Sequence, residues 1–211
     1  MSRLIRLMAA CVCAAAVLIT ATATTTAGKL SLNTRTFRAT WTNLEWVAKS
    51  FLGTETVRCP VTMEGSFHSA TIQKTRSALI GHVTKATSFS ARCTGGTFSV
   101  LQETLPWHVT YESFAGNLPN ISAVFLLLIG MSFRITSNSG LRCLARSEPN
   151  HNLTLRATLD GTGVITSLEP AANELPLTGG FPCELGNGSL LPSRSTVAVL
   201  NSSTRLIVRL I

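Results

Sequence analysis

Apolar and polar residues alternate one by one along several parts of this chain, and this period of two constrains the fold more than any other feature. In Leu153–Leu159 every second side chain is apolar, and Asp160–Gly163 follows with turn composition before Val164–Leu168. Successive side chains of a strand point to opposite faces, so the pattern predicts a hairpin with one buried face. Thr196–Leu200 and Thr204–Ile211 flank an Asn-Ser-Ser turn and predict a second hairpin.

The most apolar stretch runs from Ile121 to Ile135. Every second residue from Phe125 to Ile135 is apolar, and the opposite face is apolar at Val124–Leu128 before it becomes polar at Ser132. A strand that is buried on both faces at one end belongs inside a sheet. We therefore predict one continuous central strand here, and the run is too short for a membrane-spanning helix.

The remaining segments add strands and leave two choices between helix and strand. A capping box at Thr42–Glu45 with apolar residues at helical spacing up to Leu52 predicts a helix, but the β-rich composition of Thr36–Leu44 favours a strand through Trp46 equally. Ala70–Thr75 is predicted to form a short helical turn. Further strands are predicted at Thr56–His68, Thr97–Glu103 and Trp107–Phe114.

These elements together predict an all-β fold, either an antiparallel sandwich or a barrel, with at most one or two short helices. Turn residues recur about every ten positions, which is typical of both architectures. The choice between sandwich and barrel stays open at this point.

The first 27 residues have the pattern of a secretory leader. Arg3 and Arg6 precede an uncharged, mostly apolar stretch at Leu7–Thr20, and cleavage sites of small residues follow at Ala21–Ala23 and at Ala27. We therefore expect residues 1–27 to be removed on export, together with Cys11 and Cys13. Residues 28–211 then form a single β-rich domain outside the cell, with no transmembrane anchor in the mature chain.

Four cysteines remain after the leader, and an exported protein meets an oxidising compartment. An even number predicts two disulfide bonds, and four cysteines allow three pairings. Pairing of neighbours in sequence, Cys59 with Cys93 and Cys143 with Cys183, closes loops of moderate length and is the pairing that we expect. These spacings are too long for a zinc knuckle.

Positive charge is concentrated in the first part of the mature chain. Residues 28–92 carry nine basic and three acidic side chains, whereas residues 93–211 carry seven of each. A basic face could bind an anionic partner such as a cell-wall polymer. The basic residues are spread singly, however, which favours an ordinary solvated surface.

Several classes of enzyme are excluded by missing residues. Asp160 is the sole aspartate, which excludes an aspartic dyad and an Asp-rich calcium loop. The G-x-S-x-G, S-x-x-K and H-E-x-x-H motifs are missing too. The glycine pairs at Gly95–Gly96 and Gly179–Gly180 are typical of turns, so neither a nucleotide nor another cofactor is predicted.

The histidines supply the few catalytic candidates. His68 precedes Ser69, but neighbours on a strand point to opposite faces, so a structural role is favoured over acid–base catalysis. His108 and Glu112 share a face, with Cα atoms about 13 Å apart at 3.3 Å per residue, which is too far to share a metal ion. Spacing gives no sign that His68, His82 and His108 meet, so no metal site is predicted.

The aromatic residues suggest a binding role that composition argues against. Trp107 and Tyr111 share a strand face, and Trp41 lies near Trp46, so exposed rings could stack on a carbohydrate. Aromatic residues make up 6% of the chain, and a β core needs large side chains. We therefore favour core packing. A carrier of an apolar ligand, its mouth lined by the Phe125–Ile135 face, is a further alternative.

Four motifs resemble a family of secreted actinobacterial proteins of unknown function. They are Cys59-Pro-Val-Thr-Met-Glu-Gly-Ser-Phe-His-Ser69, Leu79-Ile-Gly-His-Val-Thr84, Leu105-Pro-Trp-His108 and Gly116-Asn-Leu-Pro-Asn-Ile121. The resemblance covers nearly all of the mature chain. It implies a bacterial, secreted, one-domain protein, and it brings no activity and no site residues with it.

The sequence thus favours a secreted β domain that acts by binding or by structure and not by catalysis. Two alternatives stay open. One is a secreted hydrolase that uses His68, or His108 with Glu112. The other is a basic binder of anionic cell-wall polymers.

Overall fold

The computed structural model describes residues 28–50 and 53–211, and it confirms the all-β class. The predicted leader, residues 1–27, lies outside the described residues. Three 3-10 turns of three residues each lie at Ser90–Arg92 (η1), Gln102–Thr104 (η2) and Cys183–Leu185 (η3). The strands of the first part of the chain are β1 (Leu30–Leu32), β2 (Thr36–Ser50), β3 (Gly53–Phe67), β4 (Thr71–Ile72), β5 (Leu79–Ser88), β6 (Gly96–Val100) and β7 (Trp107–Asn117).

The strands of the second part are β8 (Asn120–Ile129), β9 (Ser132–Ser137), β10 (Arg142–Arg146), β11 (Leu153–Leu159), β12 (Ile165–Thr178), β13 (Asn187–Leu191), β14 (Ser195–Ala198) and β15 (Val208–Leu210). No helix in the described part of the chain has the length and the apolar character needed to cross a membrane.

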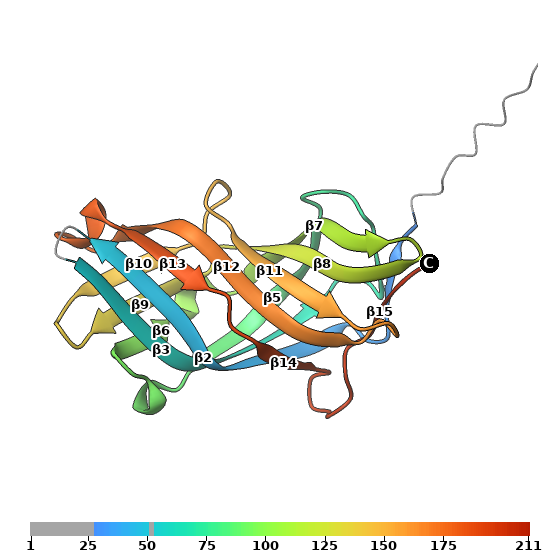
Figure 1. Ribbon diagram of the computed structural model, residues 1–211, viewed down its shortest axis with the longest axis horizontal. Helices are drawn as coiled ribbons and strands as arrows, with labels where there is room; N and C mark the ends of the chain where they lie inside the picture. The colour runs from blue at the N-terminus through green and yellow to red at the C-terminus, as the bar shows by residue number, and fades with distance from the viewer. Residues whose placement is uncertain (1–27, 51–52) are drawn as a thin grey trace, which may run out of the picture.

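The main sheet closes on itself, which decides between sandwich and barrel. Antiparallel pairing runs in the order β11-β8-β7-β5-β3-β2-β13-β12, and β12 then pairs back onto β11. These strands therefore form a closed antiparallel barrel, seen lengthwise in Figure 1. Because the sheet is closed, the two strands that would be the unpaired edges of an open sheet are hydrogen-bonded to each other.

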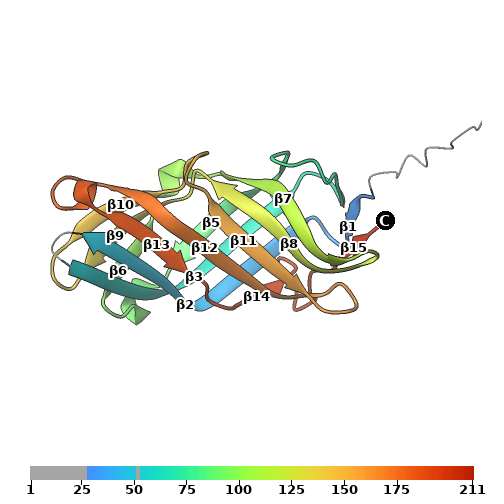
Figure 2. The same ribbon diagram turned by 45° about the horizontal axis from the view of Figure 1, so that its top comes forward.

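A smaller group of strands extends the barrel at one end. Strand β12 pairs with β10 as well as with β11. Strand β10 pairs in turn with β9, and β9 pairs with β6. Figures 1 and 2 place β6, β9 and β10 at one end of the molecule and β7, β8 and β11 toward the other. The long strands β2, β3 and β12 run through both halves and join them.

The two ends of the described chain meet at the far end of the barrel. β1 pairs with β15 and with β4 in a separate three-stranded sheet. Lys29 and Ile211 exchange backbone hydrogen bonds of 2.8 Å. Figure 1 shows this sheet beside the turn that joins β7 and β8.

Large aromatic side chains fill the interior, as the composition predicts. Trp41, Trp46 and Trp107 are each at most 1% exposed. In the half that contains β9, Phe133 stacks on Phe98 with ring centroids 4.1 Å apart and meets Trp107 edge-on at 5.4 Å. The tryptophans are therefore part of the core and are not surface platforms for a sugar.

Both predicted disulfide bonds form with the predicted pairing. Cys59–Cys93 joins β3 to the segment before β6, and Cys143–Cys183 joins β10 to η3. Both bonds hold the half that contains β6, β9 and β10.

The prediction of one continuous strand from Ile121 to Ile135 is wrong. Gly130, with φ of +85°, separates β8 from β9, which pair with different partners. The buried face also changes there. In β8 it contains Val124 and Leu128 while Leu127 is half-buried, and β9 buries Ser132 at 3% exposure. A left-handed glycine breaks the period of two without breaking the run of apolar residues.

Smaller differences follow from pairing across the sheet. Residues 36–50 form a strand and not a helix, because β2 lies between β3 and the pair β13 and β14. Ala70–Thr75 contains the strand β4 instead of a helical turn, and Thr97–Glu103 ends in η2. The C-terminal hairpin forms only as a bridge between Ala198 and Arg205, since β14 and β15 pair with β2 and β1.

Candidate functional site

Three histidines lie side by side on the outer surface of the barrel. His82 of β5 stands directly opposite His108 of β7, and Ser66 of β3 is the other neighbour of His82. His68 follows the last residue of β3. Their chain neighbours Phe67, Val83 and Trp107 are buried, so the pleat turns the histidines outward. We call His68, His82 and His108 the histidine row.

The imidazole rings of the row touch one another. His68 Nε2 and His82 Nδ1 are 3.0 Å apart, within hydrogen-bond distance. The ring centroids of His68 and His82 are 4.8 Å apart, and those of His82 and His108 are 5.1 Å apart. Burial lowers the pKa of His82, and the charges of His68 and His108 lower it further. The central imidazole is therefore neutral at neutral pH.

The carboxylates around the row are taken by other cations. Glu112 forms an ion pair with Arg76, and Glu64 forms ion pairs with Arg38 at 2.8 Å and Lys85 at 3.7 Å. The structure therefore places His108 and Glu112, the candidate pair for hydrolysis, in separate contacts. Sequence reasoning could not anticipate the row, because its three members converge only through the register of β3, β5 and β7.

The geometry of the row excludes a three-ligand metal site in its present arrangement. Within residues 28–50 and 53–211, no group of three or more His, Cys, Asp or Glu side chains is arranged to hold a metal ion. The serine next to the row is also engaged, since Ser69 Oγ accepts a hydrogen bond from the backbone N–H of Thr71. What the row offers is a pair of imidazole nitrogens facing each other.

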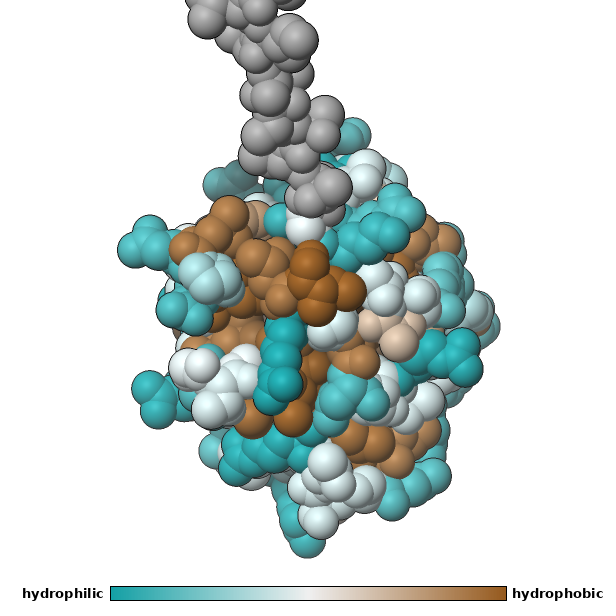
Figure 3. Space-filling model, turned by 90° about the vertical axis from the view of Figure 1, so that its right-hand side faces the viewer, coloured by the Kyte–Doolittle hydropathy of each residue, from teal (hydrophilic) through white to brown (hydrophobic). Residues whose placement is uncertain are grey.

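A second candidate is a pocket of about 440 Å³ at the end of the barrel where Lys29 pairs with Ile211. Three elements line it: the β7–β8 turn at Pro119–Ile121, the β11–β12 turn at Asp160–Gly163, and β15 at Val208–Leu210. Apolar surface broken by hydrophilic side chains covers this end (Figure 3). Leu118 and Ile211, next to the lining residues in sequence, are 60% and 64% exposed.

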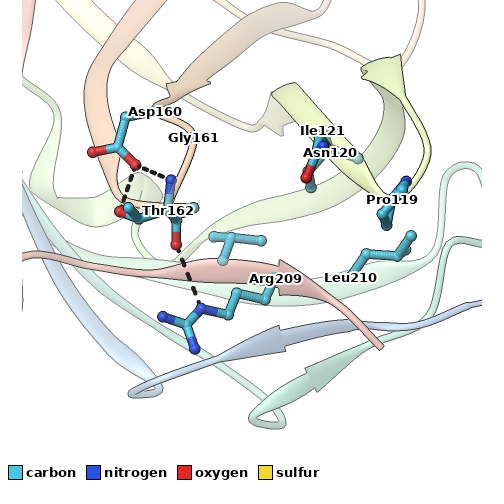
Figure 4. Close-up of a pocket in the computed structure, with 10 residues that line it drawn as sticks. Pro119, Asn120, Ile121, Asp160, Gly161, Thr162, Arg209 and Leu210 are labelled. Atoms are coloured by element: carbon cyan, nitrogen blue, oxygen red, sulfur yellow. Dashed lines mark hydrogen bonds between the residues drawn. The ribbon is translucent and has the colours of Figure 1, made fainter.

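One wall of the pocket is built by Asp160. Its Oδ1 accepts hydrogen bonds from the Thr162 backbone N–H at 2.8 Å, the Thr162 hydroxyl at 2.7 Å and the Val164 backbone N–H at 3.0 Å. These bonds, the Thr162 side-chain bond first, lower the pKa of Asp160. The carboxylate thus fixes the turn between β11 and β12 (Figure 4).

Arg209 provides the positive charge of this pocket. Its Nε donates a 3.4 Å hydrogen bond to the Thr162 carbonyl oxygen, which anchors the guanidinium against the β11–β12 turn. Figure 4 shows the Arg209 guanidinium below Thr162, with its side chain directed away from Leu210. A pocket that is lined by an arginine and by aliphatic residues suits a ligand that has an acidic group and an apolar part.

Ion pairs engage several basic residues of the first part of the chain. Arg38, Arg58, Arg76 and Lys85 are each engaged by a glutamate. Lys49 lies near the end of the 15-residue strand β2, and Lys29 lies beside the opposite end of the barrel.

The Phe125–Ile135 face does not line the mouth of a carrier. Phe125 and Leu127 are half-buried on the outside of β8, while Phe133 and Ile135 pack inside the core. The interior of the barrel is filled by side chains such as those of Trp41 and Trp46.

The chain stands apart from the known proteins with which it was compared. No protein-family model, no curated protein and no solved structure matches it.

Proposed function

We propose that this protein is exported and acts outside the cell as a non-catalytic binding domain, with its ligand site in the pocket at the end of the barrel. The ligand class that fits is a small amphipathic molecule with one acidic group. The observation that carries the proposal is that Arg209 and the aliphatic residues Ile121 and Leu210 line one pocket of about 440 Å³.

Two features support export. The chain begins with a charged, then apolar, then small-residue pattern over residues 1–27. The four cysteines of the remaining chain are all paired in disulfide bonds, which persist in oxidising compartments. The protein recovered from the culture medium is expected to begin near Thr24 or Gly28.

Two features support binding in place of catalysis. Glu64 forms ion pairs with Arg38 and Lys85, and Glu112 forms one with Arg76, so each of these carboxylates is engaged by a cation. In the end pocket the Asp160 carboxylate is engaged by hydrogen bonds from Thr162 and Val164, and the other lining residues include an arginine and aliphatic side chains, which bind and orient a ligand.

The proposal is tested with two fluorescent probes that share an apolar ring system. Anilinonaphthalene sulfonate carries an acidic group, and N-phenylnaphthylamine carries none. We expect both probes to bind the native protein. Arg209→Gln should weaken the sulfonate by about tenfold, since a charge-assisted hydrogen bond contributes about 1.5–3 kcal/mol, and should leave the uncharged probe unchanged.

Arg156→Gln is the matched control, because Arg156 is exposed on the outer face of β11 and does not line the pocket. It should change neither probe. Urea melts of each variant verify that folding is intact. Failure of both probes to bind, or equal weakening of both by Arg209→Gln, would contradict the proposed site.

A further inference from the structure

The histidine row has a geometry that neither packing nor the proposed ligand site explains. His82 contacts both His68 and His108, while Glu64 and Glu112 form ion pairs with cations. The row also lies on the side of the barrel, on residues that do not line the end pocket. We therefore consider which ligands the imidazole nitrogens of the histidine row can bind.

We propose that His68 and His82 form a two-nitrogen site for a borderline transition-metal ion such as Zn²⁺, Ni²⁺ or Cu²⁺, with His108 as a third ligand that joins by rotation of its ring. The carrying observation is the 3.0 Å separation of His68 Nε2 and His82 Nδ1. Tetrahedral zinc with Zn–N bonds of about 2.0–2.1 Å holds two ligand nitrogens about 3.3 Å apart. The two nitrogens need to separate by only a few tenths of an ångström, and each ring must also swing so that its lone pair points at the ion instead of at the partner nitrogen.

The surroundings of the pair allow this shift. His68 and His108 are exposed and His82 is half-buried, so ring rotation displaces no core residue. His82 and His108 are held opposite each other by the pairing of β5 and β7, which fixes their backbones before any ion binds. Such preorganisation reduces the entropy lost when the ion is bound.

The donor set selects the class of metal. Neutral imidazole suits zinc, copper and nickel, whereas calcium and magnesium need oxygen ligands. No carboxylate is added to the row, because Glu64 and Glu112 are engaged by cations. The hydrogen between His68 Nε2 and His82 Nδ1 must leave the space between the rings. It is restored on the outward nitrogen of the donating ring through solvent, so both imidazoles stay neutral and no net proton is released.

Isothermal titration of the folded full-length protein with zinc chloride or nickel chloride tests the proposal. We expect one ion per chain in the native protein. Binding should be lost in His82→Ala and weakened at least tenfold in His68→Gln. His108→Ala should weaken binding by a smaller factor. The same ions should raise the melting temperature of the native protein and leave that of His82→Ala unchanged.

His151→Ala is the control, because His151 is an exposed histidine in a bridge with Glu148, outside the row. It should bind like the native protein. Absence of binding at millimolar zinc and nickel, or equal binding by His68→Gln and the native protein, would overturn the proposal. His68 lies outside the strands, so His68→Gln keeps the test valid even if His82→Ala fails to fold.

Discussion

The two halves of this barrel hold together by different means. In the half that contains β7, β8 and β11, pairing is long: β8 is in register with β7 from His108 to Asn117 and with β11 from Leu153 to Thr158. In the half that contains β6, β9 and β10, the attachment to the rest of the sheet is short. β10 is in register with β12 at Leu144 and Ala145. We call these the paired half and the stapled half.

Both disulfide bonds lie beside short backbone pairings, one beside the two-residue ladder of β10 with β12 and the other beside the isolated bridge between Arg58 and Thr94. Cys143–Cys183 ties β10 to η3 beside its short contact with β12, and Cys59–Cys93 ties β3 to the segment that leads into β6. A covalent link restricts the unfolded chain, whereas a ladder stabilises the folded one. The comparison suggests that the cysteines compensate for the hydrogen bonds that the stapled half lacks.

The largest expected effect comes from removing the Cys143–Cys183 bond in the double variant Cys143→Ala/Cys183→Ala. The bond spans 40 residues, and its loss should destabilise the protein by about 3–4 kcal/mol. Native-state hydrogen exchange should accelerate most in β6, β9 and β10, while β7, β8 and β11 keep more of their protection.

Equal acceleration in both halves would contradict this expectation and would mean that the barrel opens as one cooperative unit. The second double variant, Cys59→Ala/Cys93→Ala, is the matched comparison, because it opens a similar span of 34 residues in the same half. This variant should lose a similar amount of unfolding free energy.

A smaller effect tests the paired half. Leu128 is fully buried in β8, opposite Val109 of β7 and Leu153 of β11. Leu128→Ala should cost about 3 kcal/mol, because it removes buried methyl groups and leaves a cavity. Leu127→Ala, on the half-buried outer face of the same strand, should cost about 1 kcal/mol.

Urea denaturation of the two leucine variants measures this difference. Equal losses of unfolding free energy in the two variants would mean that the outer face of β8 is buried in solution, for example against a second copy of the chain. Leu128→Ala could also destabilise the protein much less than the loss of a disulfide bond. This result would mean that backbone pairing keeps β8 in place even when its core contacts are reduced.

Much of this architecture follows from local patterns. The alternation of Leu153–Leu159 predicts β11 and its hairpin with β12, and neighbour pairing predicts both disulfide bonds. The choice of a barrel does not follow, since closure depends on β12 pairing with both β11 and β13. Nor does the break at Gly130, because a glycine in an apolar run also fits a continuous strand.

The candidate sites are less predictable than the fold. His68 and His108 stand out in the sequence as rare titratable residues, but their contact with His82 depends on the register of three strands. Nothing in the sequence distinguishes Arg209 from the other arginines. In the fold, β15 places it beside Thr162, which lies 47 residues earlier in the chain. Sites of this kind become visible only when pairing is known.

The smallest expected effect concerns the turn that joins β11 to β12 in the paired half. The pKa of Asp160 is lowered by hydrogen bonds from Thr162 and Val164, so the native state favours the charged carboxylate more than the unfolded state does. This contribution to stability is fully present above the ordinary aspartate pKa of about 4 and is lost as pH falls through the lower native value.

Asp160→Asn keeps an oxygen acceptor of the same shape but carries no charge. The melting temperature of the native protein should therefore fall slightly more than that of Asp160→Asn between pH 6 and pH 3. Because Asp160 is exposed, the gap should shrink in high salt. The extra loss at low pH should appear as faster hydrogen exchange at the ends of β11 and β12, and not in β6, β9 or β10. Identical pH curves for the two proteins would show that turn geometry alone, without the carboxylate charge, closes this end of the barrel.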